Sequence, residues 1–597
     1  MALCAEQSDG MEVKMEKIKE SFYTIINTKI TKIIINILFG ISLSNLTLIL
    51  IEDIYSNTIL KIALILLSFI ISQILCFKFN FLIKTFQNVN RIILFLSIIL
   101  GIFTALSIYE NMLNYAVLYH PKLYTIVAVL SIVILLYCFY KKVAYYFKKY
   151  IHSLDKIEKY YLIISMILLT ISTIFLYNIT NVFHFNKLKP EYYDYTIEYN
   201  SGSSVENIDK YYYIAQSQYN SRNYNVLYSS DTQWLLNTDV FNSISEKEND
   251  IRQPLFGLFS IPFSIVPKTI AMLFSNNEIL YSILLAIVQG FLVLIGFTLI
   301  GRLMKLNGIS KVIFLIFLTI SFPSLLFLLN LEQYVFAVFY MIVFIYMCIN
   351  KIKDKNFAYI MATGSMITSG IMFPLLCEKN NIKKSIQNFS FTFLKCLAIF
   401  IVSARILLIL PEGINSQINT ISTFSKSENI NFPIAKYTNF LEETILFSDF
   451  NVIHSNLETK VFKLDGEVAK LTANKPQIID ANTNTISIIG IIFFAIALIG
   501  FILNRHDKYS QISLIWLLFS LILFVVLGWG KTENDLVLYI YYFSWAIISL
   551  IYKFIDKIFN KHIKLKIITC SILLFPMLII NLNGMIRIIQ FGIQYYS

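Results

Sequence analysis

Hydrophobic and polar positions along this chain fall into long blocks, with no short alternating period. Apolar runs of about 18 to 22 residues recur throughout, and each is long enough to cross roughly 30 Å of hydrocarbon as an α-helix. Polar stretches that are rich in lysine separate them. The pattern predicts about thirteen transmembrane helices, over residues 33–51, 59–78, 92–109, 123–140, 160–178, 279–301, 311–329, 333–349, 392–410, 486–503, 511–528, 536–552 and 566–582.

Two further apolar segments do not fit a simple crossing. Residues 254–275 are interrupted by Pro254, Pro262 and Pro267. A crossing there would leave the following basic loop on the outer side, so we expect an interfacial helix. Residues 357–376 have lysines on both flanks and contain glycine and proline. We expect them to form a re-entrant pair of half-helices, which only neighbouring protein can bury.

Composition supports the same class. The chain is 57% hydrophobic and 14% charged, with a mean hydropathy of +0.66, whereas a soluble domain carries roughly 25% charged residues. The predicted fold class is therefore an all-α polytopic membrane protein. Continuous apolar runs exclude a β-barrel, whose strands alternate in polarity. The seven cysteines show no CxxC or metal-ligand spacing, which argues against disulfides and a cysteine metal site.

Positive charge is unevenly distributed. The net charge is +12, but the lysines cluster in short loops between predicted spans. This distribution indicates cytoplasmic loops rather than nucleic-acid binding. The N-terminus is then cytoplasmic and the two long polar segments are external. Abundant Ile, Lys, Asn and Tyr suggest an AT-rich bacterial genome, hence the bacterial inner membrane.

These assignments divide the chain into consecutive parts. The predicted parts are a cytoplasmic N-terminal segment 1–31, four N-terminal transmembrane helices 32–159, a transmembrane module 160–410 with a first external loop 179–253 and an interfacial helix 254–275, a second external segment 411–485, and C-terminal transmembrane helices 486–597.

Acidic and basic residues sit close to the predicted outer surface. Asp194 and Asp209 lie in the first external loop, and Asp209 opens the run Asp-Lys-Tyr-Tyr-Tyr-Ile-Ala. Arg252 closes that loop in Arg-Gln-Pro-Leu. Glu332 follows Asn-Leu in a short external turn between two spans, where an acid is expensive unless it is used or paired.

Two further cations complete the set of candidates. Arg405 lies inside the span at 392–410, and an intramembrane arginine is a functional hypothesis by default. Lys531 precedes a span that contains Tyr539, Tyr541 and Tyr542. For each of these residues a plainer role is available: a solvated loop acid, a turn acid, or a cation that reaches the headgroups.

The order and membrane side of these short motifs resemble the GT-C glycosyltransferases, polytopic enzymes that take a sugar from a polyprenyl-phosphate carrier. The likeness covers roughly residues 160–555. It departs in having four extra N-terminal spans and a long gap between the fifth span and Asp209, which keeps Asp194 open as the equivalent residue.

The resemblance implies sugar transfer from a polyprenyl-phosphate donor to a glycan, lipid or protein acceptor on the external face. Asp209, or Asp194, would be the base, with Glu332 as a further catalytic acid. Arg405, Lys531 and Arg252 would bind the lipid phosphate. No metal ligands are assigned, and a divalent cation as cofactor remains open.

Two rival functions share the same architecture. An O-antigen polymerase or ligase also has about a dozen spans, but relies on arginines in its large loops, and the second polar segment here has none. A flippase or transporter of lipid-linked oligosaccharides would need ionisable residues within its spans, and most spans here lack them. A non-catalytic membrane scaffold is the third alternative.

Overall fold

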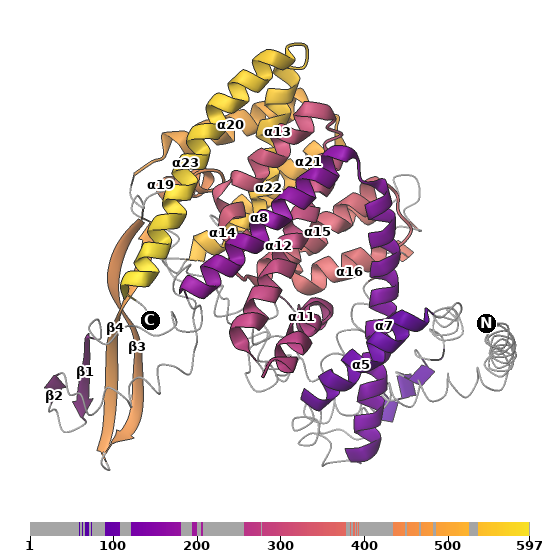
Figure 1. Ribbon diagram of the computed structural model, residues 1–597, viewed down its shortest axis with the longest axis vertical. Coiled ribbons are helices and arrows are strands. Elements are labelled where there is room, and N and C mark those ends of the chain that lie inside the picture. Colours follow the sequence, from indigo (N-terminus) through magenta and orange to yellow (C-terminus); the bar gives the residue numbers. More distant parts are fainter. Residues whose placement is uncertain are drawn as a thin grey trace, which may run out of the picture. The chain divides into compact units, whose positions relative to one another are not determined.

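The computed structural model divides this chain into two compact units. Figure 1 labels the helices and strands by their order in the chain. The described residues are 90–107, 121–180, 194–199, 204–206, 253, 256–275, 277–377, 434–447, 450–464, 467–480, 485–523 and 535–595, with scattered positions within 59–73 and 383–392. In the strands and in parts of several helices only the backbone is described.

The first unit comprises residues 1–147 and 397–411. Its described helices are α5 (Arg91–Ser107) and the first part of α7 (Pro121–Ser153). The backbone N–H of Asn90 donates to the Tyr137 hydroxyl at 3.3 Å, which ties the start of α5 to α7. Both helices lie where the sequence predicts spans.

The second unit holds most of the described helices. They are α8 (Lys156–Thr180), α11 (Phe256–Leu273), α12 (Glu278–Leu303), α13 (Gly308–Ile320), α14 (Phe322–Leu329), α15 (Gln333–Ile349), α16 (Lys355–Ser365), the 3-10 helix η3 (Ile367–Leu376), α19 (Ile434–Glu443), α20 (Ile488–Leu503), α21 (Lys508–Leu521), α22 (Asp535–Ile558) and α23 (Ile563–Tyr595).

Among the described residues, three helices are long and apolar enough to cross a membrane: Lys156–Ile179, Ile279–Leu303 and Ile563–Gln594. A fourth span results if the bent pair α13 and α14 counts as one. The membrane class is thus supported by helix length and composition, whereas the count of about thirteen spans stays a prediction. The predicted spans 33–51 and 392–410 lie almost wholly outside the described residues.

Close packing between helices depends on small residues. A Cβ on Gly290 of α12 would lie 2.5 Å from the Leu169 side chain of α8. A Cβ on Gly500 of α20 would lie 2.1 Å from the backbone oxygen of Leu550 of α22. Glycine lets helix backbones approach this closely inside a membrane, where no hydrophobic effect between helices replaces good packing.

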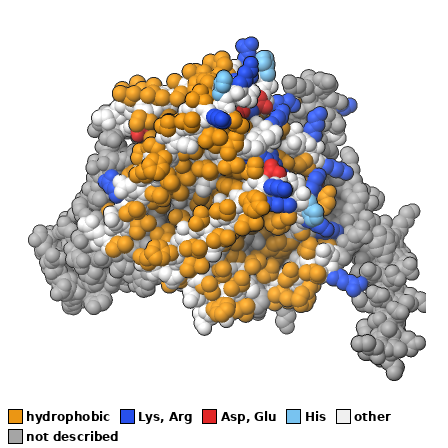
Figure 2. Space-filling view, turned by 45° about the horizontal axis from the view of Figure 1, so that its top comes forward, with side chains coloured by type: hydrophobic (Ala, Val, Ile, Leu, Met, Phe, Trp, Pro, Cys, Tyr) orange, Lys and Arg blue, Asp and Glu red, His pale blue; other side chains and the backbone are white. Residues whose placement is uncertain are grey.

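Several loops meet at one end of the helices. The Lys553 ammonium donates to the Met304 oxygen and pairs with Asp507, and Lys566 donates to the Ser310 hydroxyl. Lys and Arg side chains gather towards one edge of a broad apolar surface (Figure 2). The loops after α12, α20 and α22 therefore meet at one end of the second unit. That this end faces the cytoplasm stays a prediction.

The two segments with irregular hydropathy form broken or short helices. Residues 357–376 divide at Met366 into α16 and η3, which are two short pieces, as the sequence predicts. Residues 254–275 form α11, which packs on α12 and α15, and the Tyr340 hydroxyl donates to the Phe259 oxygen at 2.8 Å. The re-entrant and interfacial positions of these segments stay predictions.

A small antiparallel sheet adds to the helical architecture. Its strands β1 (Asp194–Tyr199), β2 (Ser204–Glu206), β3 (Phe450–Leu464) and β4 (Glu467–Asp480) follow the order β2-β1-β4-β3. The all-α prediction holds for the apolar segments but not for the two polar ones. The β1–β4 pair joins polar segments that are far apart in the sequence, so both lie on the same side of the helices.

Candidate functional site at a break between membrane helices

The helix that begins at Gly308 breaks at Ser321. α13 and α14 meet there at an angle of 66°. Pro323 lies in the first turn of α14, where its missing N–H is tolerated and its fixed φ favours a new helix start. The Ser321 hydroxyl donates to the Leu318 oxygen at 2.8 Å and to the Ser324 hydroxyl at 2.9 Å.

Backbone groups released by this break find partners on other elements. The backbone N–H of Phe322 donates to the Ile445 oxygen at 3.1 Å. The side-chain amide of Asn581 on α23 donates to the Ile320 and Ile445 oxygens, both at 2.8 Å. An unsatisfied backbone group in hydrocarbon costs several kcal/mol, so these bonds make a broken helix possible here.

The stretch between α14 and α15 is held by Gln289. Its Nε2 donates to the Phe327 oxygen at 2.9 Å and to the Asn330 oxygen at 2.7 Å. Its Oε1 accepts the backbone N–H of Glu332 at 2.9 Å. Gln289 and Glu332 are both 0% exposed. The sequence predicts a turn here between two spans, and Glu332 lies buried in such a turn, between α14 and α15. That this turn is external stays a prediction.

The Glu332 carboxylate caps the start of α15. Its Oε1 accepts the Tyr334 N–H at 3.5 Å, a long contact. The ring of Tyr334 lies 5.3 Å from that of Tyr539 and 5.1 Å from that of Tyr542. Phe327 and Tyr541 are 5.7 Å apart, centroid to centroid. The tyrosine-rich part of α22 therefore packs against the break.

A buried carboxylate in such a place has two possible uses. It can accept and return a proton as a general base or acid, or it can serve only as a helix cap. Ionisable groups inside membrane bundles are expensive and are commonly retained for function. This junction, formed by Gln289, Asn330, Glu332 and Tyr334, is the candidate site.

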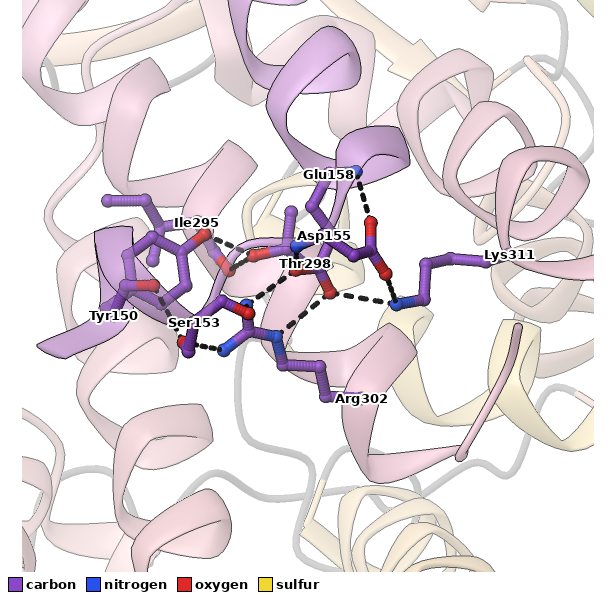
Figure 3. A network of polar contacts seen from close by, with 8 residues as sticks. All are labelled: Tyr150, Ser153, Asp155, Glu158, Ile295, Thr298, Arg302 and Lys311. Carbon is purple, nitrogen blue, oxygen red and sulfur yellow. Dashed lines mark hydrogen bonds and ion pairs between the residues drawn. The ribbon is translucent and has the colours of Figure 1, made fainter. Parts of the chain in front are cut away.

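A second polar cluster lies at the C-terminal end of α12 (Figure 3). Arg302 donates to both carboxylate oxygens of Glu158, from Nε at 2.9 Å and from its terminal nitrogen at 2.5 Å. Lys311 donates to Glu158 at 3.0 Å and to Asp155 at 2.5 Å. Two acids balance two bases, so the cluster fastens the α7–α8 turn to α12 and α13.

Two groups at the edge of this cluster, Asp155 and Tyr150, have shifted pKa values. Burial raises the pKa of the Asp155 carboxyl, but hydrogen bonds from Lys311 and from the Glu158 N–H outweigh it and hold that pKa below its ordinary value. Burial raises the pKa of Tyr150 to about 12. Its hydroxyl shares a 2.5 Å hydrogen bond with Thr298 and stays protonated at neutral pH.

Two of the six residues singled out from the sequence are described. Asp194 is the first residue of β1, and its backbone lies opposite that of Asn474 in β4. Glu332 lies in the turn between α14 and α15. β1 and α15 are not in extended contact within the described part of the chain, so the structure does not bring these two together. Asp209, Arg252, Arg405 and Lys531 lie outside the described residues.

Two residues that build the site were not foreseen. Gln289 is a single amide within a long apolar run, and Asn581 lies at the end of another, two residues before Asn583. Such an amide signals a cross-helix hydrogen bond, so this feature alone could have found them. In the part of the chain with described side chains, no group of three or more His, Cys, Asp or Glu could hold a metal ion.

Comparison with known proteins gives no relative. No family model matches the chain, and neither a characterised protein nor a solved structure shows significant similarity.

Proposed function

We propose that this protein is a GT-C-type membrane glycosyltransferase that moves a sugar from a polyprenyl-phosphate donor to a glycan, lipid or protein acceptor. The observation that carries the proposal is the meeting of two motifs about two hundred residues apart. The Asn330–Glu332 turn and the tyrosine-rich start of α22 pack together through Tyr334.

The sheet gives independent support. A transferase that works on the external face would have both long polar segments on that face. The pairing of β1 with β4 brings the two long polar segments to one side. The proposed location is the bacterial inner membrane, with the N-terminus in the cytoplasm and these segments outside.

The proposed chemistry assigns a role to each charged group. A carboxylate, Asp209 or alternatively Asp194, takes the proton from an acceptor hydroxyl. The acceptor oxygen forms a bond to the anomeric carbon of the sugar. The bond from that carbon to the phosphate oxygen breaks, and the polyprenyl phosphate leaves with the electron pair. Arg405, Lys531 and Arg252 stabilise that anion, and Glu332 supplies a further acid at the break.

Transport of a lipid-linked sugar is a second candidate, favoured by the same break. Discontinuous helices with polar groups near mid-depth are typical of transporter binding sites. The bent α13–α14 pair is a discontinuous helix, and Glu332 follows it as a buried polar group. The two functions differ in outcome: a transferase releases polyprenyl phosphate, whereas a transporter leaves the donor intact on the other side.

The deciding experiment uses the full-length protein in liposomes with a panel of radiolabelled polyprenyl-phosphate sugars and lipid or glycan acceptors. The expected result is label in the acceptor and free polyprenyl phosphate. Movement of intact donor across the bilayer, without transfer, would reject the transferase and favour the transporter.

Glu332→Gln tests the buried carboxylate. If Glu332 exchanges protons during transfer, the rate should fall by about 10² or more. Asp155→Asn is the matched control, a carboxyl-to-amide change at the opposite end of α12, and should keep the rate. Full activity in folded Glu332→Gln would show that Glu332 serves only as a helix cap. Asp209→Asn and Asp194→Asn would then be tested in the same way.

A further inference from the structure

Lys268 is a buried cation at the end of the bundle that lacks the ion-pair cluster. The residue is 8% exposed and lies in α11, about one turn before that helix ends. The short connection to α12 follows at once, and Arg302 marks the opposite end of α12. The charge of Lys268 is therefore far from the basic loops.

The other buried lysines of the described part of the chain each pair with a carboxylate. Of the three lysines in the described part of the chain that are buried, Lys311 pairs with Glu158 and Asp155, and Lys566 pairs with Asp556. Lys268 forms no ion pair with a described carboxylate. Its ammonium lies 4.9 Å from the centre of the Tyr281 ring. A cation–π contact offsets only part of what burying a charge costs.

The surroundings of Lys268 form a polar face on α11. Ser260, Ser264 and Lys268 follow one another at a spacing of four residues, which places them on one side of the helix. All three are buried, whereas Val266 and Ile270 on the other side are 43% and 36% exposed. α11 thus turns a polar stripe towards the protein and an apolar one away from it.

We propose that Lys268 binds the phosphate group of a membrane lipid on the protein-facing side of α11. A buried ammonium with no carboxylate partner among the described residues needs another anion to balance its charge. A phosphate ester can accept several hydrogen bonds from it. The identity of that lipid as the polyprenyl-phosphate carrier rests on the proposed function. Lys268 is then a carrier-binding cation that the sequence motifs did not reveal.

Binding of a polyprenyl phosphate to the purified full-length protein, followed by native mass spectrometry in detergent, tests this inference. Lys268→Met should weaken binding about tenfold, since one charge-assisted contact is lost. Lys268→Arg should retain most of the affinity. Lys353→Gln, an exposed loop lysine at the other end, should leave the affinity unchanged.

Two outcomes would overturn the proposal. One is unchanged affinity in Lys268→Met. The other is displacement of the polyprenyl phosphate by inorganic phosphate at equal concentration, which would make this a site for the free anion. Lipid-free Lys268→Met should be at least as thermally stable as the parent, because an unpaired buried charge is removed. This checks that weaker binding does not reflect unfolding.

The result can be separated from the test of the proposed function. Loss of lipid binding in Lys268→Met without any sugar transfer by the parent protein would keep the lipid site and reject the transferase. Sugar transfer by the parent with normal lipid binding in Lys268→Met would keep the transferase and reject this site.

Discussion

The side-chain oxygen of Gln289 accepts the backbone N–H of Glu332 at 2.9 Å. The same amide donates to two backbone oxygens, of Phe327 and Asn330. One side chain in the middle of α12 thus satisfies three backbone groups where α14 ends and α15 begins. The break can be buried because a neighbouring helix supplies the hydrogen bonds that a continuous helix would make for itself.

Gln289→Leu should destabilise the protein strongly. It leaves three buried backbone groups without this partner, each worth about 1–3 kcal/mol, so we expect a loss of about 3 kcal/mol after partial relaxation. Unfolding of the detergent-solubilised protein by denaturant measures it. Gln511→Leu, at an exposed amide on α21, is the control and should change stability by less than about 0.5 kcal/mol. Equal effects would mean that Gln289 does not hold the break.

Lys311→Met should also be costly, by about 2 kcal/mol, because Glu158 is 1% exposed and would lose one of its two cationic partners, Lys311 and Arg302. The exposed Lys508→Met is the control. A double-mutant cycle with Glu158→Gln measures the pair directly, and a coupling of about 1 kcal/mol or more is expected for contacting charges. Additive single effects would argue against an energetic role for this ion pair.

Gly500→Ala should loosen the α20–α22 contact. The added Cβ would lie 2.1 Å from the Leu550 oxygen, and backbone cannot give way as a side chain can. Overpacking of this kind costs about 1–3 kcal/mol. Gly301→Ala is the matched control in α12, since its nearest contacts would be 3.9 Å away. Thermal stability should fall for the first variant only, and a similar fall in both would point to general glycine effects.

The pairing of β1 with β4 can be tested by cross-linking. Ile197 lies opposite Leu471 in the register, so cysteines at both positions should form a disulfide in a background without the native cysteines. Ile197→Cys with Lys475→Cys should not, because four residues along a strand separate the sites by roughly 13 Å. Gel mobility before and after reduction gives the yield. Equal yields would show that the two polar segments are not held in this register.

Much of the helical framework follows from hydropathy. The helices α8, α12 and α15 contain the predicted runs 160–178, 279–301 and 333–349, because a length of apolar sequence directly specifies a membrane helix. Hydropathy could not show the break at Ser321, since residues 311–329 are apolar throughout. The signal there is Pro323, and only the partners, Ile445 just after α19 and Asn581 on α23, show how the break is tolerated.

The candidate site could be predicted from the sequence less well than the helical framework. The acid at 332 was recognisable as a charged residue in a turn between apolar runs. Its complete burial and its contact with Gln289 were not predicted, because they depend on the packing of α12 against this turn. Lys268 was overlooked because the charge rule indicated an interfacial helix over residues 254–275, where a lysine is unremarkable.

The sequence by itself determined the membrane class, the positions of most helices and the grouping of basic loops, because these depend on the local free energy of transferring side chains into hydrocarbon. The tertiary structure decided which polar groups share a site. It paired Gln289 with Glu332, placed Tyr334 against α22 and joined the two polar segments in one sheet. Those contacts depend on hydrogen bonds and packing between elements that are distant in the sequence, which local transfer energies do not encode.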